Sequence, residues 1–152
     1  MTFRITGLPA ETFSGLFNLT NAELAAEGGV RRVAQGREPC RISLTDATPG
    51  DELILVNFEH LPVDSPYRMR FAVFIRRGEH RFDEIDFVPE QLRSRMLAVR
   101  SFDAHGMLVA HTLADGRELE LAIERLFCDS TAAYLHVHYA SAGCYAARID
   151  RA

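Results

Sequence analysis

The stretch that decides the fold runs from residue 48 to residue 76 and reads TPGDELILVNFEHLPVDSPYRMRFAVFIR. It opens with Thr48-Pro49-Gly50-Asp51, a strong turn signal because proline presets one dihedral and glycine tolerates the next. The apolar runs at 52–58 and 70–76 predict two strands, the second of them central in its sheet. The two prolines between these runs predict a loop.

The residues before this stretch predict short elements. An alternating start predicts a strand, and Pro9 can open a helix because its missing N–H would be unpaired there anyway. Thr20 followed by Glu23 is a capping-box pattern, and the helix it opens must end at Gly28-Gly29. Two short strands are expected at 30–34 and 41–44.

The residues after it alternate between short strands and short helices. We expect an irregular segment at 83–87, a helix opened by Pro89, strands at 97–102 and 107–113, and a helix capped by Asp115. A hairpin of strands 133–139 and 145–149 closes the chain. Because regular strand-helix-strand alternation is absent, we predict an α+β fold: one domain over 1–152, with a mainly antiparallel, twisted sheet and three or four short flanking helices.

Composition excludes several classes of protein. All 17 basic residues are arginine, and they are outnumbered by 21 acidic residues spread along the chain, so no basic stripe exists for nucleic acid. No apolar run approaches the roughly 18 residues needed to span a bilayer. The start of the chain also lacks the pattern of a signal peptide, so we expect a cytoplasmic protein that binds neither membrane nor nucleic acid.

A His-x-His pair in the final hairpin is the first candidate site. On a strand, His136 and His138 project from the same face and can ligate one divalent metal such as zinc. Cys144 and His60 are further candidate ligands. The plainer interpretation is that both histidines face water or bond to backbone groups on a half-buried sheet.

The same region suggests thiol chemistry. Three cysteines in a chain without export signals predict reduced thiols. Cys144 follows a glycine turn and can lie near an imidazole, and Cys40 is adjacent to Arg41, whose charge favours a thiolate. The alternative for each is a small buried apolar residue, which is also what we expect of Cys128.

The loop between the two best strands is the third candidate. Ser65, Tyr67 and Arg68 offer hydroxyl donors and a bidentate cation, from which a site for a small anion can be built. Arg41 joins it if the sheet brings the two together. The alternative is that Arg68 pairs with an acid while Tyr67 packs under the loop.

Several of these segments together resemble a known family. They are PCRISL at 39–44, DATPGD at 46–51, His60 with SPYR at 65–68, and HVH at 136–138 with GCY at 143–145. The chain thereby resembles, over nearly its whole length, the uncharacterised bacterial family called domain of unknown function 1203. The resemblance implies a full-length, single-domain protein and brings no established activity. It suggests that the polar segments share one cleft.

Three functions from different classes remain open. The favoured one is a module that binds a small polar or anionic molecule through Arg41, Tyr67 and Arg68, with the histidines lining the cleft. The second is a metal- or thiol-dependent enzyme that uses the His-x-His pair and Cys144. The third is an interaction domain or homodimer without small-molecule chemistry. Nucleotide-loop, Walker, G-x-S-x-G, H-E-x-x-H and C-x-x-C motifs are absent.

Overall fold

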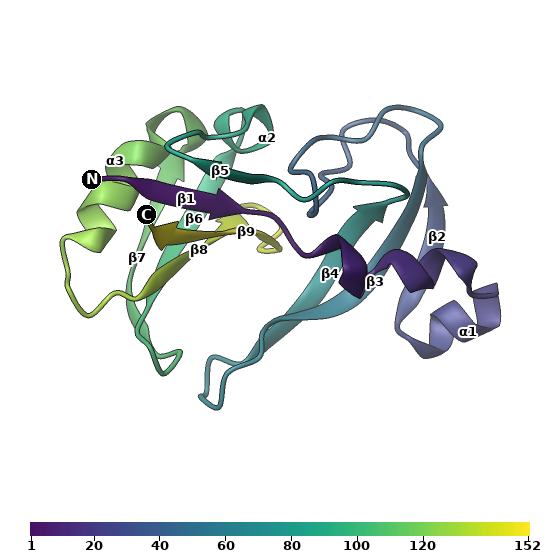
Figure 1. Cartoon of the computed structure of the whole chain (residues 1–152), viewed down its shortest axis with the longest axis horizontal. Coiled ribbons are helices and arrows are strands. Elements are labelled where there is room, and N and C mark those ends of the chain that lie inside the picture. The colour runs from purple at the N-terminus through teal and green to yellow at the C-terminus, as the bar shows by residue number, and fades with distance from the viewer.

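The computed structural model describes residues 1–152 and has the predicted α+β architecture, with two antiparallel sheets instead of one (Figure 1). The strands are β1 (Phe3–Thr6), β2 (Gly29–Val33), β3 (Glu52–Leu61), β4 (Met69–Arg76), β5 (Asp83–Ile85), β6 (Met96–Phe102), β7 (Leu108–Asp115), β8 (Tyr134–Tyr139) and β9 (Tyr145–Arg151). The α-helices are α1 (Asn21–Ala26), α2 (Glu90–Arg93) and α3 (Leu119–Phe127). Short 3-10 helices are η1 (Ala10–Thr12), η2 (Ser14–Asn18) and η3 (Gly116–Glu118). No helix is long and apolar enough to cross a membrane.

The larger sheet has the strand order β5-β1-β9-β8-β6-β7, which places β8 inside it. Leu135, Val137 and Tyr139 alternate along β8 and pack into the main core. Ile123 and its neighbours on α3 cover that same face of the sheet. The opposite face of β8 carries His136 and His138, whose rings lie near His60 of β3 in the smaller sheet.

The smaller sheet, β2-β3-β4, forms a second core with η1 and η2. Its side chains Ile54, Val56 and Val73 pack with Phe13 and with Tyr145 of the larger sheet. Tyr145 is thus a point of contact between the two sheets, which lie on either side of the centre in Figure 1.

The tips of two hairpins also join the sheets. The β3–β4 loop meets the β6–β7 turn at Gly106, where an added Cβ would lie 2.6 Å from Val63. Gly106 has φ +78°, so glycine is required there both for the backbone conformation and for the close approach. The Ser65 hydroxyl donates to the Gly106 carbonyl at 2.9 Å.

Local sequence signals predicted many elements correctly. The Thr20 capping box is present, with Glu23 bonded reciprocally to the Thr20 backbone. Gly28, the second residue after α1, has φ +75°. This is the left-handed backbone conformation in which glycine commonly ends a helix. Asp115 does cap a helix, although the first turn it caps is η3, with α3 following directly.

Three predictions about strands are wrong. The strand at 70–76, expected to be central, is β4 at the edge of its three-stranded sheet, and the central strand is β3. Residues 41–44 form turns instead of a strand, because Arg41 bonds backbone-to-backbone with Phe74 and Leu8 and has no ladder beyond them. Residues 83–85, expected to be irregular, form β5 by pairing with β1. All three outcomes depend on how segments far apart in the sequence pair, which a local pattern does not reveal.

Candidate functional site

A cavity of about 550 Å³ lies where the turn before β9 meets the segment around Arg41. This volume is in the range of about 300–1,000 Å³ that small-molecule sites occupy. We call it the arginine cavity. Its lining residues are Arg37, Pro39, Arg41, Phe74, Ser94, Arg95, Met96, Tyr139, Ala140, Ser141, Ala142 and Cys144. Three of them are cations and none is acidic.

Arg41 is the most deeply placed of these cations, with only 1% of its surface exposed. Its Nε donates to the Tyr145 carbonyl at 2.7 Å, and its Nη1 donates to the Pro39 carbonyl. The second terminal nitrogen, Nη2, makes no hydrogen bond within the protein. None of the ion pairs in the structure includes Arg41, so a buried positive charge faces the cavity without a carboxylate.

Tyr139 lies between two arginines of the cavity. The guanidinium carbons of Arg41 and Arg95 lie 5.0 Å and 5.3 Å from the centre of its ring. The face of an aromatic ring attracts cations, so Tyr139 partly compensates for the missing carboxylate. Its hydroxyl donates to Gln91 of α2, which fixes the ring in place. Burial raises the pKa of this hydroxyl, which keeps it protonated and neutral.

The other two cations differ in their pairing. Arg95 donates to Asp46 at 2.8 Å and to the Arg37 carbonyl at 3.3 Å. Arg37 is exposed, takes no part in any ion pair, and has φ +75°. Asp46 therefore neutralises one of three positive charges, which leaves the cavity with two in excess.

Three imidazoles gather between the two sheets, and Tyr145 connects them to this cavity. The ring centres of His60 and His138 are 5.5 Å apart, those of His60 and His136 are 6.1 Å apart, and those of His136 and His138 are 6.3 Å apart. All three side chains are buried. The Tyr145 ring stacks on His60 at 4.8 Å, while the Tyr145 carbonyl receives Arg41 on the cavity side. We call these three residues the histidine cluster.

The histidine cluster is held in its neutral form. Burial lowers the pKa of His60 to about 4 and that of His138 to about 3. The pKa of His136 is also well below its usual value, because of burial and then the neighbouring charges of His138 and His60. Arg100 and Arg148 flank His136 on β6 and β9 and add to the effect. Each ring is therefore uncharged at neutral pH.

Hydrogen bonding in the histidine cluster is incomplete. His138 Nδ1 lies 3.0 Å from the Gly143 carbonyl and must donate to it, which assigns the neutral tautomer. Both ring nitrogens of His60 and Nδ1 of His136 are buried without a partner. No group of three or more histidine, cysteine, aspartate or glutamate side chains is placed to hold a metal ion. The expected fourth group, Cys144, lines the arginine cavity, which contains no histidine.

The three cysteines occupy different environments. Cys40 is fully buried, and burial together with the Glu79 charge raises its pKa to about 12 in spite of Arg76 and Arg41. The expectation that Arg41 makes Cys40 a thiolate is therefore wrong, because desolvation exceeds the attraction. Cys144 is partly exposed in the cavity. Cys128 is exposed at the end of α3, so the expectation that it is buried is also wrong, because it follows the last buried turn of the helix.

The loop residues Ser65, Tyr67 and Arg68 do not line the arginine cavity. Ser65 accepts a hydrogen bond from the Tyr67 amide and bonds to the β6–β7 turn. The Tyr67 ring packs edge-on against Phe102 at 6.3 Å. Arg68 forms a bidentate ion pair with Glu59. The structure gives this loop a role in joining two hairpins, and of the predicted anion-binding group only Arg41 reaches the cavity.

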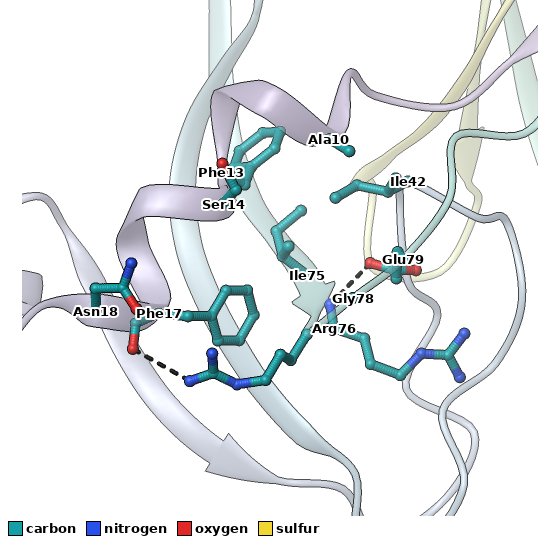
Figure 2. Close-up of a pocket in the computed structure, with 11 residues that line it drawn as sticks. Ala10, Phe13, Ser14, Phe17, Asn18, Ile42, Ile75, Arg76, Gly78 and Glu79 are labelled. Atoms are coloured by element: carbon teal, nitrogen blue, oxygen red, sulfur yellow. Dashed lines mark hydrogen bonds between the residues drawn. The ribbon is translucent and has the colours of Figure 1, made fainter.

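A second, smaller cavity of about 250 Å³ lies between η2 and the end of β4 (Figure 2). The carboxylate of Glu79 accepts hydrogen bonds from the Arg76 amide at 2.8 Å and from the Ser43 hydroxyl, and it takes part in no ion pair. Arg77 pairs with Glu52 and donates to the Phe17 carbonyl, as the dashed line in Figure 2 shows. Since Arg76 also pairs with Asp51, this cavity offers an anionic ligand no cation that lacks a carboxylate partner.

Comparison with known proteins adds one finding. The model of a family described as a protein of unknown function, DUF1203, matches residues 37–151, well over half of the chain. The chain belongs to DUF1203. No curated protein and no solved structure matches it. The matched region of this DUF1203 protein starts at Arg37, and it contains every residue of the arginine cavity and of the histidine cluster.

Sequence reasoning did not identify the other two cations of the cavity in this DUF1203 protein, Arg37 and Arg95, or the aromatic ring of Tyr139 between Arg41 and Arg95. Arg37 and Arg95 lie 58 positions apart yet meet through a side-chain bond to a backbone carbonyl. Tyr139 follows the His-x-His pair and points to the opposite face of β8. The strand period would have separated Tyr139 from the histidines, but nothing in the local sequence indicates that it faces two arginines.

Proposed function

We propose that the protein binds a small organic anion, with a carboxylate or phosphate group held in the arginine cavity. One observation supports this more than any other: Arg41 is buried, has a free Nη2 and lacks a carboxylate partner. A buried charge is costly unless it is paired, and a bound anion would supply the pair. Arginine also matches the planar geometry of carboxylate and the oxygens of phosphate.

The remaining lining defines the rest of the ligand. Phe74, Met96 and the alanines at 140 and 142 present apolar surface beside the cations. A cavity with a few directed polar groups and an otherwise apolar wall suits a molecule with one charged end and one apolar end. Inorganic anions would use the arginines and leave this apolar wall exposed to water.

The test uses benzoate and its neutral analogue benzamide, which have nearly the same shape. Titrations followed by NMR at low ionic strength should show benzoate binding at residues of the arginine cavity, with benzamide at least about tenfold weaker. Equal binding of the two, or chemical-shift changes confined to other surfaces, would contradict the proposal. Added salt should weaken the binding because the charges are partly solvated.

A matched pair of variants separates the cavity from general surface charge. Arg37→Gln removes an unpaired cation that lines the cavity, and Arg32→Gln removes an exposed cation of β2 that does not. Both change the net charge equally. We expect a several-fold loss of benzoate affinity in the first and none in the second. Equal losses would mean that only long-range charge attracts the ligand.

A further inference from the structure

We propose that Cys144 is a thiol-modification site selective for anionic disulfides, which the arginine cavity positions for thiol–disulfide exchange. The proposal rests on the proposed function and names one class of anion that the cavity would take. It uses a residue that simple binding of an anion does not require.

The position of Cys144 supports this step. Its side chain is partly exposed and lines the same cavity as Arg37, Arg41 and Arg95. The second observation is independent of the cysteine: Arg41, with 1% of its surface exposed, lines that cavity and has neither a hydrogen bond at Nη2 nor a carboxylate partner. A disulfide that carries carboxylates can thus pair with the arginines while its sulfur atoms remain beside Cys144.

The chemistry balances without any further reactant. The Cys144 thiol loses its proton to solvent, and the thiolate attacks one sulfur of the ligand disulfide. The ligand S–S bond breaks as a new S–S bond to Cys144 forms. The other half of the ligand leaves as a thiolate and takes up a proton from water. The ligand disulfide is the oxidant, and a free thiol reverses the reaction.

The chain contains its own controls. Cys128 is exposed at the end of α3 and does not line the cavity, so it reports the reactivity of an ordinary surface thiol. Cys40 has no exposed surface and a pKa raised to about 12, so it should not react in the folded protein. The selectivity of Cys144 can therefore be measured as a ratio within one molecule.

The experiment treats the reduced full-length protein with oxidised glutathione, which is anionic, or with cystamine, which is cationic. Peptide mass spectrometry follows the rate of mixed-disulfide formation at Cys144 and Cys128. We expect the Cys144-to-Cys128 rate ratio to be at least about tenfold higher with oxidised glutathione than with cystamine. A ratio that is the same for both reagents, or a Cys144 that does not react, would overturn the proposal.

Two variants and a competing ligand distinguish a failure of the thiol proposal from a failure of the anion-binding proposal. Arg37→Gln should lower the glutathione preference of Cys144 several-fold, whereas Arg32→Gln should leave it unchanged. Benzoate should slow modification of Cys144 and not of Cys128. If benzoate binds in the cavity but Cys144 shows no preference for oxidised glutathione, the thiol proposal fails and the anion-binding proposal stands. If benzoate binds nowhere and Cys144 still prefers the anionic reagent, the anion-binding proposal fails as stated.

Discussion

The arginine cavity and the histidine cluster both contact the segment from Gly143 to Tyr145. They differ in whether their buried basic side chains are charged. In the cavity Arg41 stays charged, and carbonyls and an aromatic face compensate for the missing carboxylate. In the cluster His60, His136 and His138 lose their charge, because burial lowers their pKa. The difference follows from the guanidinium, which cannot release its proton near neutral pH, whereas imidazole can.

This contrast suggests that the two regions that contact this hairpin have different roles. The cavity keeps positive charge available to a ligand, and the cluster provides an uncharged contact between the sheets. Conditions that protonate imidazole should therefore disturb the cluster first and leave the charge of the cavity unchanged.

Acidification is the perturbation with the largest expected effect. The folded-state pKa of each cluster histidine is below its usual value, so the unfolded chain binds more protons between about pH 6.5 and 4. The contribution of the three histidines to the free energy of unfolding is fully present above pH 6.5. The free energy of unfolding then falls as the pH decreases, by at most about 4 kcal/mol per pH unit for the three groups. Urea unfolding at pH 7.5, 6 and 5 measures it. The exposed-residue control, His111→Gln, should keep the slope, and a flat profile for the parent protein would contradict the assignment.

The Arg41→Met variant tests how much the buried arginine of the cavity contributes to the free energy of unfolding. It removes the donors to the Tyr145 and Pro39 carbonyls and should lower the free energy of unfolding by about 2–4 kcal/mol. Arg95→Met is the comparison, since Arg95 is partly exposed and should cost less. Urea denaturation of both variants at pH 7.5 gives the order. A smaller loss for Arg41 than for Arg95 would show that the buried guanidinium is not structurally important.

His60→Phe separates the imidazole from its packing. Phenylalanine can keep the stack on Tyr145 and removes two ring nitrogens that have no partner. We expect the free energy of unfolding at pH 7.5 to be unchanged or raised by up to about 1 kcal/mol, and the pH slope to fall by about a third. A loss above about 2 kcal/mol would mean that His60 has a polar partner in solution.

Ser65→Ala tests the β3–β4 loop, which belongs to neither the arginine cavity nor the histidine cluster. It removes the bond to the Gly106 carbonyl and should cost about 0.5–1 kcal/mol without changing benzoate affinity or the pH slope. Arg68→Ala, whose side chain is 60% exposed in its pair with Glu59, should leave the urea midpoint unchanged. Reduced benzoate binding in either variant would mean that this loop contributes to the ligand site.

The sequence was most informative where the structure is local. The capping box at Thr20 and the closing hairpin follow from neighbouring residues, and the two-residue period correctly put His136 and His138 on one face. The α+β class followed from the order of strands and helices.

The parts that could not be predicted depend on long-range packing. Arg37, Arg95 and Tyr139 form one cavity only because α2 and the turn before β9 come together. For Cys40 the adjacent Arg41 was a misleading signal, because adjacency in sequence does not show that a thiol is buried. The division into two sheets likewise depends on which strands pair, and β5 finds its partner in β1, which lies far from it in the chain.

The pairing of β1 also affects how the molecule is made. β1 lies between β5 and β9 (Figure 1). The Thr2 hydroxyl donates to the carbonyl of Ala152 at 2.7 Å. During synthesis β1 therefore cannot pair with β9 until β9 has left the ribosome. Until then β1 presents an unpaired edge, a state that favours association between unfinished chains. A permuted sequence in which β9 directly precedes β1 would shorten that interval.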